Sequence, residues 1–294
     1  MFERLQAHLD QLHWKELAKR VVHRLGYSVT RIDPRDRSQD VRVEDPFLDQ
    51  QRIVQTAARG DKSQIVFDVG ANVGQSVTTY RALFPEARIH AFEPLPKAYR
   101  QLLLAADAAG NTQVNQLALH DASGVRPFCS NRGGANQTSS FLPPAEDVRH
   151  GYPAHAYQLE KMIEVQVNTL DAYCEEHGIE HIDVLKMDTQ GTELDVLRGA
   201  ERMLSKRAIT LAYIEVVFTN HYVGNAMYHD IAAFLAERGY DLFRIYQQHY
   251  GTAGRHIGGD AVFIERSILN KYCDQHFQRQ TTDQSAISAA AQAR

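Results

Sequence analysis

The sequence predicts an α/β fold with a mostly parallel, seven-stranded sheet and helices on both faces. Runs rich in Val, Ile, Leu, Phe and Tyr recur between residues 61 and 266, and stretches of helical periodicity separate most of them. Such alternation is typical of a parallel sheet covered on both sides. A glycine-containing turn follows the first run, at the place where such a sheet binds its ligand.

The elements follow from these patterns in chain order. The expected strands are 65–69, 88–92, 113–119, 182–188, 209–217, 240–246 and 260–265. The expected helices are 75–84, 96–109, 191–205 and 226–239. Segment 120–170 breaks the alternation, with short strand candidates at 125–129 and 163–168 around a long polar loop. We expect residues 131–140 to form a lid over the ligand and residues 249–259 to form a second rim.

The chain divides into three regions. Residues 1–60 are predicted to be an N-terminal helical extension, 61–266 the main domain, and 267–294 a disordered tail poor in apolar residues. Apolar positions at steps of three and four predict an amphipathic helix over 1–25, with a basic second half. This helix either packs on the main domain or on a second copy of the chain, or contacts a membrane surface.

Composition limits the class of protein. The 294 residues carry a net charge of -4, which favours neither a nucleic-acid partner nor an acidic tail. Cys129, Cys174 and Cys273 are far apart and form no CxxC pair, so reduced thiols are expected rather than a disulfide framework or a zinc site. The chain shows no signal-peptide order and no apolar run of about 20 residues. We therefore expect a cytoplasmic protein.

The turn after the first strand contains Asp68, Gly70, Ala71, Asn72 and Gly74. Its two glycines are spaced GxxxG, so the GxGxxG fingerprint of dinucleotide folds is absent, as is a P-loop lysine. A carboxylate at the strand end would repel a pyrophosphate. It suits a ligand with a positive amino group, such as the methionine part of S-adenosylmethionine.

A second acidic residue follows the second strand. Glu93 comes 25 positions after Asp68, where a carboxylate in a nucleotide-binding α/β fold accepts both ribose hydroxyls. The alternative is a solvated surface glutamate. Pro94 has no N–H and ends the strand.

These motifs resemble the FkbM-type methyltransferases over about residues 60–265. The resemblance rests on Phe67 to Gly74, Phe92 to Pro94 and Leu185 to Glu193, with further matches at Thr169 to Asp171, Leu197 to Ala200, and Ile214 with Glu215. It implies a class I, Rossmann-like methyltransferase fold, S-adenosylmethionine as methyl donor and, commonly, methylation of hydroxyls on sugars, polysaccharides or polyketides.

The resemblance also implies roles for single residues. Asp68, Gly70, Asn72 and Gly74 would line the methionine end of the cofactor, and Glu93 would hold its ribose. Leu119 and Asp121, after the third strand, are candidates for the adenine side.

The candidate catalytic residues lie at the ends of the fourth and fifth strands. If these strands are neighbours, the carboxylates of Asp188 and Glu215 converge, which suits Mg²⁺ or a base with an orienting partner. Alternatively, Asp188 holds the methionine amino group and Glu215 meets backbone groups. His221 is a third candidate, as the base that takes the acceptor's proton. Whether a metal is bound stays open.

The leading prediction is a methyltransferase that uses S-adenosylmethionine to O-methylate a sugar, a polysaccharide or a secondary metabolite. Two alternatives stay open: a nicotinamide-dependent oxidoreductase and a non-catalytic nucleotide-type binding module. The missing third glycine and Asp68 count against the oxidoreductase. The intact turn and Glu93 count against the binding module.

Overall fold

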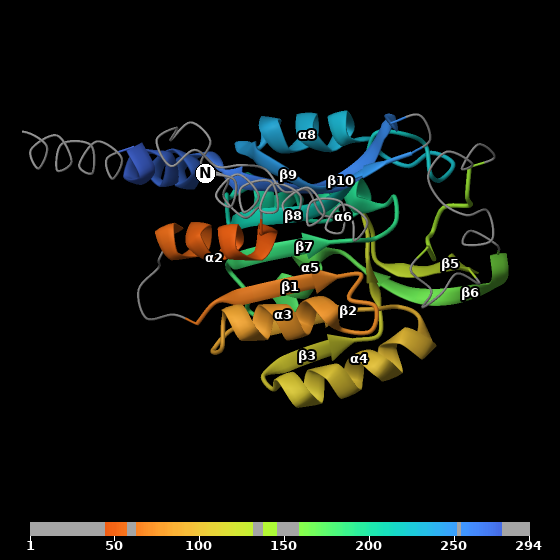
Figure 1. Cartoon of the computed structure of the whole chain (residues 1–294). Helices are drawn as coiled ribbons and strands as arrows, with labels where there is room; N and C mark the ends of the chain where they lie inside the picture. Colours follow the sequence, from red (N-terminus) through yellow and green to blue (C-terminus); the bar gives the residue numbers. More distant parts are fainter. Residues whose placement is uncertain (1–44, 58–62, 132–137, 146–158, 252–253, 278–294) are drawn as a thin grey trace, which may run out of the picture. The chain divides into compact units, whose positions relative to one another are not determined.

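In the computed structural model, the described residues are 45–57, 63–131, 138–145, 159–251 and 254–277. Their centre is a seven-stranded sheet made of β1 (Ile65–Val69), β2 (Arg88–Phe92), β3 (Thr112–Asn115), β7 (Ile182–Met187), β8 (Ile209–Val217), β9 (Tyr240–Tyr250) and β10 (His256–Glu265). The order is β3-β2-β1-β7-β8-β10-β9 (Figure 1). Neighbours from β3 to β8 are parallel, and β10 is antiparallel to β8 and β9. The predicted mostly parallel seven-stranded sheet is confirmed.

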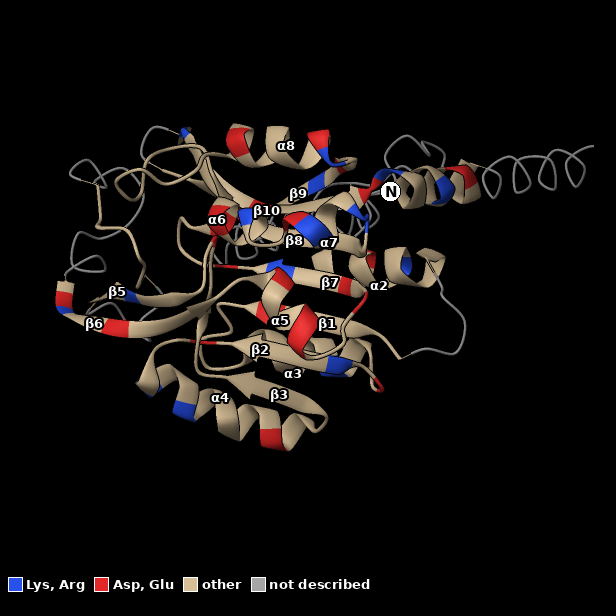
Figure 2. Cartoon of the chain, turned by 180° about the vertical axis from the view of Figure 1, so that it is seen from behind, with Lys and Arg blue, Asp and Glu red and all other residues tan. Residues whose placement is uncertain are grey.

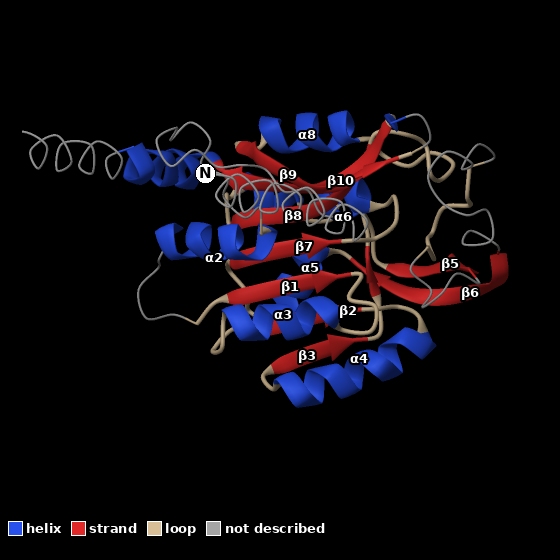
Figure 3. Ribbon diagram, viewed as in Figure 1, coloured by secondary structure: helices blue, strands red, loops and turns tan. Residues whose placement is uncertain are grey.

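Helices cover both faces of this sheet (Figure 3). One face carries α2 (Pro46–Ala57), α3 (Gln75–Leu83) and α4 (Pro96–Ala109), and the other carries α5 (Leu170–Glu176), α6 (Glu193–Arg198), α7 (Glu201–Ser205) and α8 (Tyr228–Glu237). Each face has its own core. Ile53 and Tyr80 are fully buried on the first face, and Leu170 and Leu235 on the second. Burying one such aliphatic side chain contributes about 1.5–3 kcal/mol.

A second, three-stranded sheet is built from segment 118–168. It consists of β4 (Ala118–Leu119), β5 (Gly124–Asn131) and β6 (Leu159–Asn168), in the order β4-β6-β5. The predicted single strand 113–119 is therefore wrong: β3 belongs to the large sheet, whereas Ala118 and Leu119 pair with β6. Phe128 and Val165 of this sheet pack on α4 through Leu95 and Ala98, at the helix's first turn.

The predicted helix 191–205 is two helices, α6 and α7. Gly199 and Ala200 separate them, and position 199 requires glycine because a Cβ atom there would lie 2.0 Å from the carbonyl oxygen of His120. The carboxylate of Asp171 then accepts hydrogen bonds from the backbone N–H groups of Arg202 and Met203, in the first turn of α7. Helix α5 was not predicted, although Thr169 is its N-cap and accepts a hydrogen bond from the N–H of Ala172.

Residues at both ends of the described chain join the main body, which differs from the predicted boundaries. Helix α2 packs Ile53 and Val54 into the first core, so the body begins at Asp45 rather than at residue 61. Residues 266–277 are helical, so predicted disorder from residue 267 is wrong there. Tyr272 is 3% exposed, and Lys271 donates a hydrogen bond to the carbonyl of Thr56 in α2. Apolar packing on α2 thus orders a segment of polar composition.

The described surface is electrostatically mixed, with acidic and basic residues interspersed along helices and strands (Figure 2). All three cysteines are free, in agreement with the expected thiols. Among the described helices we find none whose length and hydrophobicity would let it span a bilayer. The predicted helix 1–25 and most of the predicted lid, residues 132–137, lie outside the described residues.

Candidate functional site

A cavity of about 520 Å³ lies at the carboxyl ends of the parallel strands. This volume is within the usual range for a small-molecule site. At its β1 end the lining residues include Gly70, Ala71, Asn72, Glu93 and Pro94, and at its β8 end they include Tyr213, Glu215, Gln247, His249 and Asp260. Asp188 lies between the two ends because β7 stands between β1 and β8.

The turn after β1 is held tightly against its neighbours. The N–H groups of Gly70 and Ala71 donate to the carbonyl of Phe92, at 3.1 and 2.9 Å. Gly70 has a φ of 76°, and a Cβ atom there would lie 2.0 Å from the carbonyl oxygen of Asp188. Only glycine fits this position, so the turn can press against the end of β7 while it lines the cavity.

Gly74 has a different role from the predicted one. It does not contribute to the cavity lining. Its φ is 95°, and a Cβ atom would lie 2.7 Å from the Cβ of Ala105 in α4. Gly74 therefore lets α3 and α4 approach each other closely.

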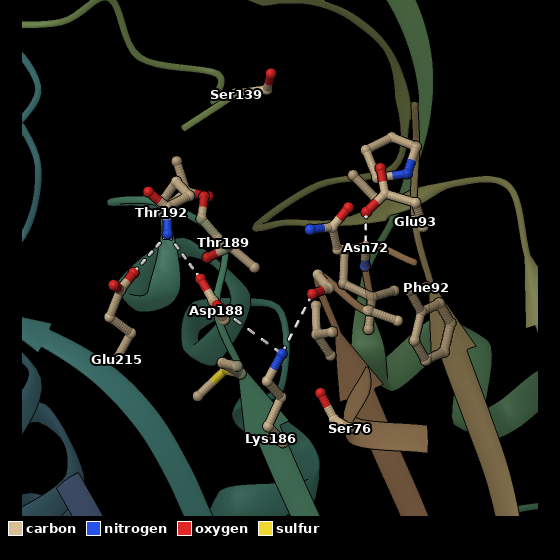
Figure 4. Close-up of a pocket in the computed structure, with 18 of the residues that line it drawn as sticks. Asn72, Ser76, Phe92, Glu93, Ser139, Lys186, Asp188, Thr189, Thr192 and Glu215 are labelled. Carbon is tan, nitrogen blue, oxygen red and sulfur yellow. Dashed lines mark hydrogen bonds and ion pairs between the residues drawn. The ribbon is translucent and has the colours of Figure 1, made fainter. Parts of the chain in front are cut away.

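Asp68 is fully buried and does not line the cavity, so it is not placed to contact a ligand directly. Its Oδ1 pairs with Nζ of Lys186 at 3.0 Å. Lys186 also donates to the carbonyl oxygen of Gly70 at 3.2 Å and lies 3.9 Å from Oδ2 of Asp188 (Figure 4). Burial alone would lower the pKa of Lys186, but the carboxylates of Asp68 and Asp188 raise it above its ordinary value. Lys186 thus stays charged and ties β1 to β7.

Lys186 lines the cavity, and the sequence analysis did not single it out. The available signal was a single lysine inside the otherwise apolar run of β7. A buried ammonium needs a partner.

Glu93 occupies the position predicted for a ribose partner. Its Oε2 accepts the N–H of Asn72 at 3.0 Å (Figure 4), and its Oε1 accepts the N–H of Leu95 at 2.8 Å. The side chain is buried, and this burial raises its pKa to about 7, although the two backbone N–H groups act in the opposite direction. A fixed carboxylate remains at the cavity wall, with lone pairs available for hydroxyl groups.

The two candidates for the adenine side separate in the structure. Leu119 lines the cavity, together with Phe92, Phe128 and Phe141, as part of an apolar wall. Asp121 does not line the cavity. Its carboxylate pairs with His120 and Arg126, each at 2.7 Å.

The two candidate catalytic carboxylates converge, as predicted for neighbouring strands. β7 and β8 are parallel neighbours, so Asp188 and Glu215 leave adjacent strand ends. Nε2 of Gln190 donates to Oδ1 of Asp188 and to Oε2 of Glu215, both at 2.7 Å (Figure 4). Burial, followed by the charge of Asp188, raises the pKa of Glu215 well above its ordinary value.

A metal at this pair gains no support from the described side chains. No group of three or more His, Cys, Asp or Glu residues among them is arranged to hold an ion. The Gln190 amide nitrogen, a hydrogen-bond donor, bridges the two carboxylates.

Histidines complete the β8 end of the cavity. His221 lines it, and burial and the nearby His249 lower the pKa of His221, which favours the neutral form. Asp260 accepts a hydrogen bond from the Tyr213 hydroxyl at 2.9 Å, and its pKa is raised by burial.

Comparison with known proteins identifies one family. The model described as "Methyltransferase FkbM domain" matches residues 68–242, which is more than half of the chain.

Three curated relatives are similar to this chain over part of their length. The 2-O-methyltransferase NoeI of Sinorhizobium fredii is 27% identical over 48% of this chain and 59% of its own. The 31-O-demethyl-FK506 methyltransferase FkbM of Streptomyces tacrolimicus is 32% identical over 47% and 59%. Methyltransferase sdnD of Sordaria araneosa is 26% identical over 61% and 74%. The chain thus spans about three fifths of NoeI and FkbM.

Proposed function

We propose that this chain, which belongs to the FkbM methyltransferase family, transfers a methyl group from S-adenosylmethionine to a hydroxyl group. One observation carries the proposal. A single cavity holds a fixed carboxylate, Glu93, at its β1 end and a converging pair, Asp188 and Glu215, next to its β8 end. The first suits a ribose, and the second suits an acceptor that must lose a proton.

The residues of the β1 end fit the chemistry of S-adenosylmethionine. Glu93 would accept hydrogen bonds from the ribose hydroxyls, and the apolar wall of Phe92, Leu119 and Phe141 would pack on the adenine. At the methionine end, Asn72 lines the wall and Asp188 offers a carboxylate, 45% exposed, to the amino group. When bound, the cofactor would supply a methyl group attached to a sulfonium sulfur. The electron pair of the sulfur–methyl bond would return to sulfur, and the demethylated cofactor would be the leaving group.

We assign the role of general base to Glu215. An alcohol is a poor nucleophile while it is protonated, and a base works best when its pKa is near the operating pH. Burial beside Asp188 raises the pKa of Glu215 in that direction. Glu215 would take the hydroxyl proton as the oxygen–methyl bond forms and the sulfur–methyl bond breaks. His221, kept neutral by burial, is the second candidate.

For the acceptor we propose a sugar, a polysaccharide or a secondary metabolite. Two relatives carry names that specify oxygen methylation, one a 2-O-methyltransferase and one acting on 31-O-demethyl-FK506. The β8 end is lined by hydroxyl, amide, imidazole and carboxyl groups, which suit a polyhydroxylated molecule. A cytoplasmic location, and a membrane or self-association role for residues 1–25, remain predictions.

Calorimetry tests the cofactor. We expect S-adenosylmethionine and its demethylated product to bind and NADH not to bind. The substitution Glu93→Ala should weaken binding roughly tenfold to a hundredfold, because hydrogen bonds to a charged group contribute about 1.5–3 kcal/mol. Glu86→Ala, at an exposed glutamate, is the matched control. Binding of NADH alone would favour the oxidoreductase, and unchanged affinity in Glu93→Ala would remove Glu93 from the site.

Turnover with a panel of hydroxylated acceptors tests the rest. Binding of the cofactor without methylation of any acceptor would favour the binding module. A two-carboxylate Mg²⁺ site predicts that a chelator abolishes turnover and that Mg²⁺ restores it. Turnover that is insensitive to the chelator would reject that site.

A further inference from the structure

We propose that Gln190 is a positioning residue, whose side-chain amide aligns the carboxylates of Asp188 and Glu215 for proton removal from the acceptor. This inference rests on the proposed function, because it assigns a role within the same site.

The amide of Gln190 is shared evenly between the two acids. Its nitrogen carries two N–H groups, and one points to Oδ1 of Asp188 and the other to Oε2 of Glu215, at 2.7 Å each. Hydrogen bonds of this length are strongest when the accepting carboxyl group is ionised. Gln190 does not use the second oxygen of either carboxylate, so each acid keeps an oxygen for another partner.

The orientation of this amide is fixed from its other side. The hydroxyl of Tyr222, a side chain 2% exposed, lies 2.8 Å from Oε1 of Gln190 and 3.0 Å from the carbonyl oxygen of Thr138, and the shorter distance favours donation of its one proton to Gln190. The side-chain hydroxyl of Ser140 donates to the backbone carbonyl of Gln190 at 2.7 Å. With its oxygen on the Tyr222 side, the amide presents its N–H groups to Asp188 and Glu215, whose carboxylate oxygens require a donor.

The backbone at Gln190 is also unusual. Its φ is 57°, in the left-handed region that a side chain other than glycine rarely adopts. The turn is held by Glu193, which accepts the N–H of Thr189 at 2.8 Å and that of Gly191 at 3.1 Å. Strained conformations of this kind persist where the surroundings over-determine them, and they cluster at functional sites.

The charges around Glu215 explain why such a donor is useful. Burial opposes ionisation of Glu215, and so do three acids: Asp188 just after β7, Glu193 of α6 and Asp260 of β10. Lys186 is the nearby cation, and it is paired with Asp68. The Gln190 amide favours the ionised form of Glu215, so its removal should make Glu215 hold its proton to higher pH.

Carbon-13 NMR of protein labelled at the glutamate carboxyl groups tests this without a methyl donor or acceptor. The Glu215 signal is identified by its loss in Glu215→Gln. In Gln190→Met and in Gln190→Gly, we expect the Glu215 titration midpoint to rise by roughly one pH unit or more, which is a tenfold change in proton concentration. Glycine adopts the left-handed backbone without strain, so an effect common to both variants belongs to the amide.

Gln247→Met is the matched control. Gln247 is also a glutamine with positive φ, 44°, in the same cavity, but it makes no hydrogen bond to Asp188 or Glu215. We expect the wild-type midpoint in this control and a rise in Tyr222→Phe, which releases the amide. An unchanged midpoint in both Gln190 variants, or an equal rise in Gln247→Met, would overturn the proposal. The titration gives its answer even if the wild type fails to bind S-adenosylmethionine, which would overturn the proposed function alone.

Discussion

Replacing Glu93 by Gln should change the pH dependence of stability in a way that can be worked out from the structure. Burial raises the pKa of Glu93 from 4.5 to about 7 in the folded protein. Between these values the folded state holds a proton that the unfolded chain has released. The stabilisation that this bound proton gives the folded state is complete below pH 4.5 and is lost as the pH rises to about 7. At roughly 1.4 kcal/mol per pH unit, the loss amounts to about 3 kcal/mol.

Glutamine has the same shape but does not titrate. It also places an NH₂ group against the N–H of Asn72 or of Leu95, each of which donates to the carboxylate in the wild type. That mismatch should destabilise Glu93→Gln by about 1–3 kcal/mol at any pH. The variant should therefore be less stable than the wild type at pH 5, and the difference should shrink or reverse by pH 8.

Urea unfolding of the cofactor-free protein at pH 5, 6, 7 and 8 measures this difference directly. Comparison of variant with wild type cancels the contributions of other titrating groups. Glu86→Gln, at an exposed site, should follow the wild-type curve. Parallel curves for wild type and Glu93→Gln would refute the reasoning, because they would mean that Glu93 does not hold a proton in the folded state.

Further predictions concern the turn, the buried ion pair and the sheet. Gly70→Ala should destabilise the protein by about 2–5 kcal/mol in urea unfolding, through backbone strain and the clash with the end of β7. Gly110 has a φ of 66° but no atom within 4 Å of an added Cβ, so Gly110→Ala should lower the free energy of unfolding by only about 1–2 kcal/mol. Lys186→Met should cost about 3–5 kcal/mol by leaving Asp68 buried and unpaired, and adding Asp68→Asn should recover part of the loss. Burial and nearby positive charge lower the pKa of His90 to about 4, so the wild type should lose up to about 3 kcal/mol as the pH falls from 6.5 to 4. His90→Gln should not show that loss. Equal acid sensitivity of the two proteins would contradict it.

The turn after β1 could be predicted because its causes are local. A run of five residues, four of them apolar, is followed by Gly70, which takes the positive φ that glycine favours. The convergence of Asp188 and Glu215 was predictable for a similar reason. It required only that consecutive strands of an α/β sheet be neighbours, and β7 and β8 are.

The roles of Asp68 and Asp121 could not be predicted in this way. Each depends on a partner that the local pattern does not reveal. Asp68 is paired with Lys186, distant in sequence, because β1 lies beside β7. The Asp121 carboxylate accepts a hydrogen bond from Arg126 of β5, in the segment that forms the smaller sheet. Non-local pairing of β1 with β7 decided the role of Asp68, whereas Asp121 is paired with the nearby residues His120 and Arg126.

Part of the cavity lining lies outside the family match. The β1 end is lined by residues inside 68–242, among them Gly70 and Glu93, whereas Gln247, His249 and Asp260 lie beyond it on β9 and β10. Phe47 of α2 lies before it and packs edge-on against Tyr213, 5.8 Å between ring centroids. Under the proposed function, the matched segment would bind the common cofactor, and the acceptor would meet α2, β9 and β10 in addition to matched residues such as Glu215. Two members of such a family can bind the same methyl donor through the matched segment and differ in their acceptor through residues outside it. Specificity for the acceptor is then a difference in affinity at those outside residues.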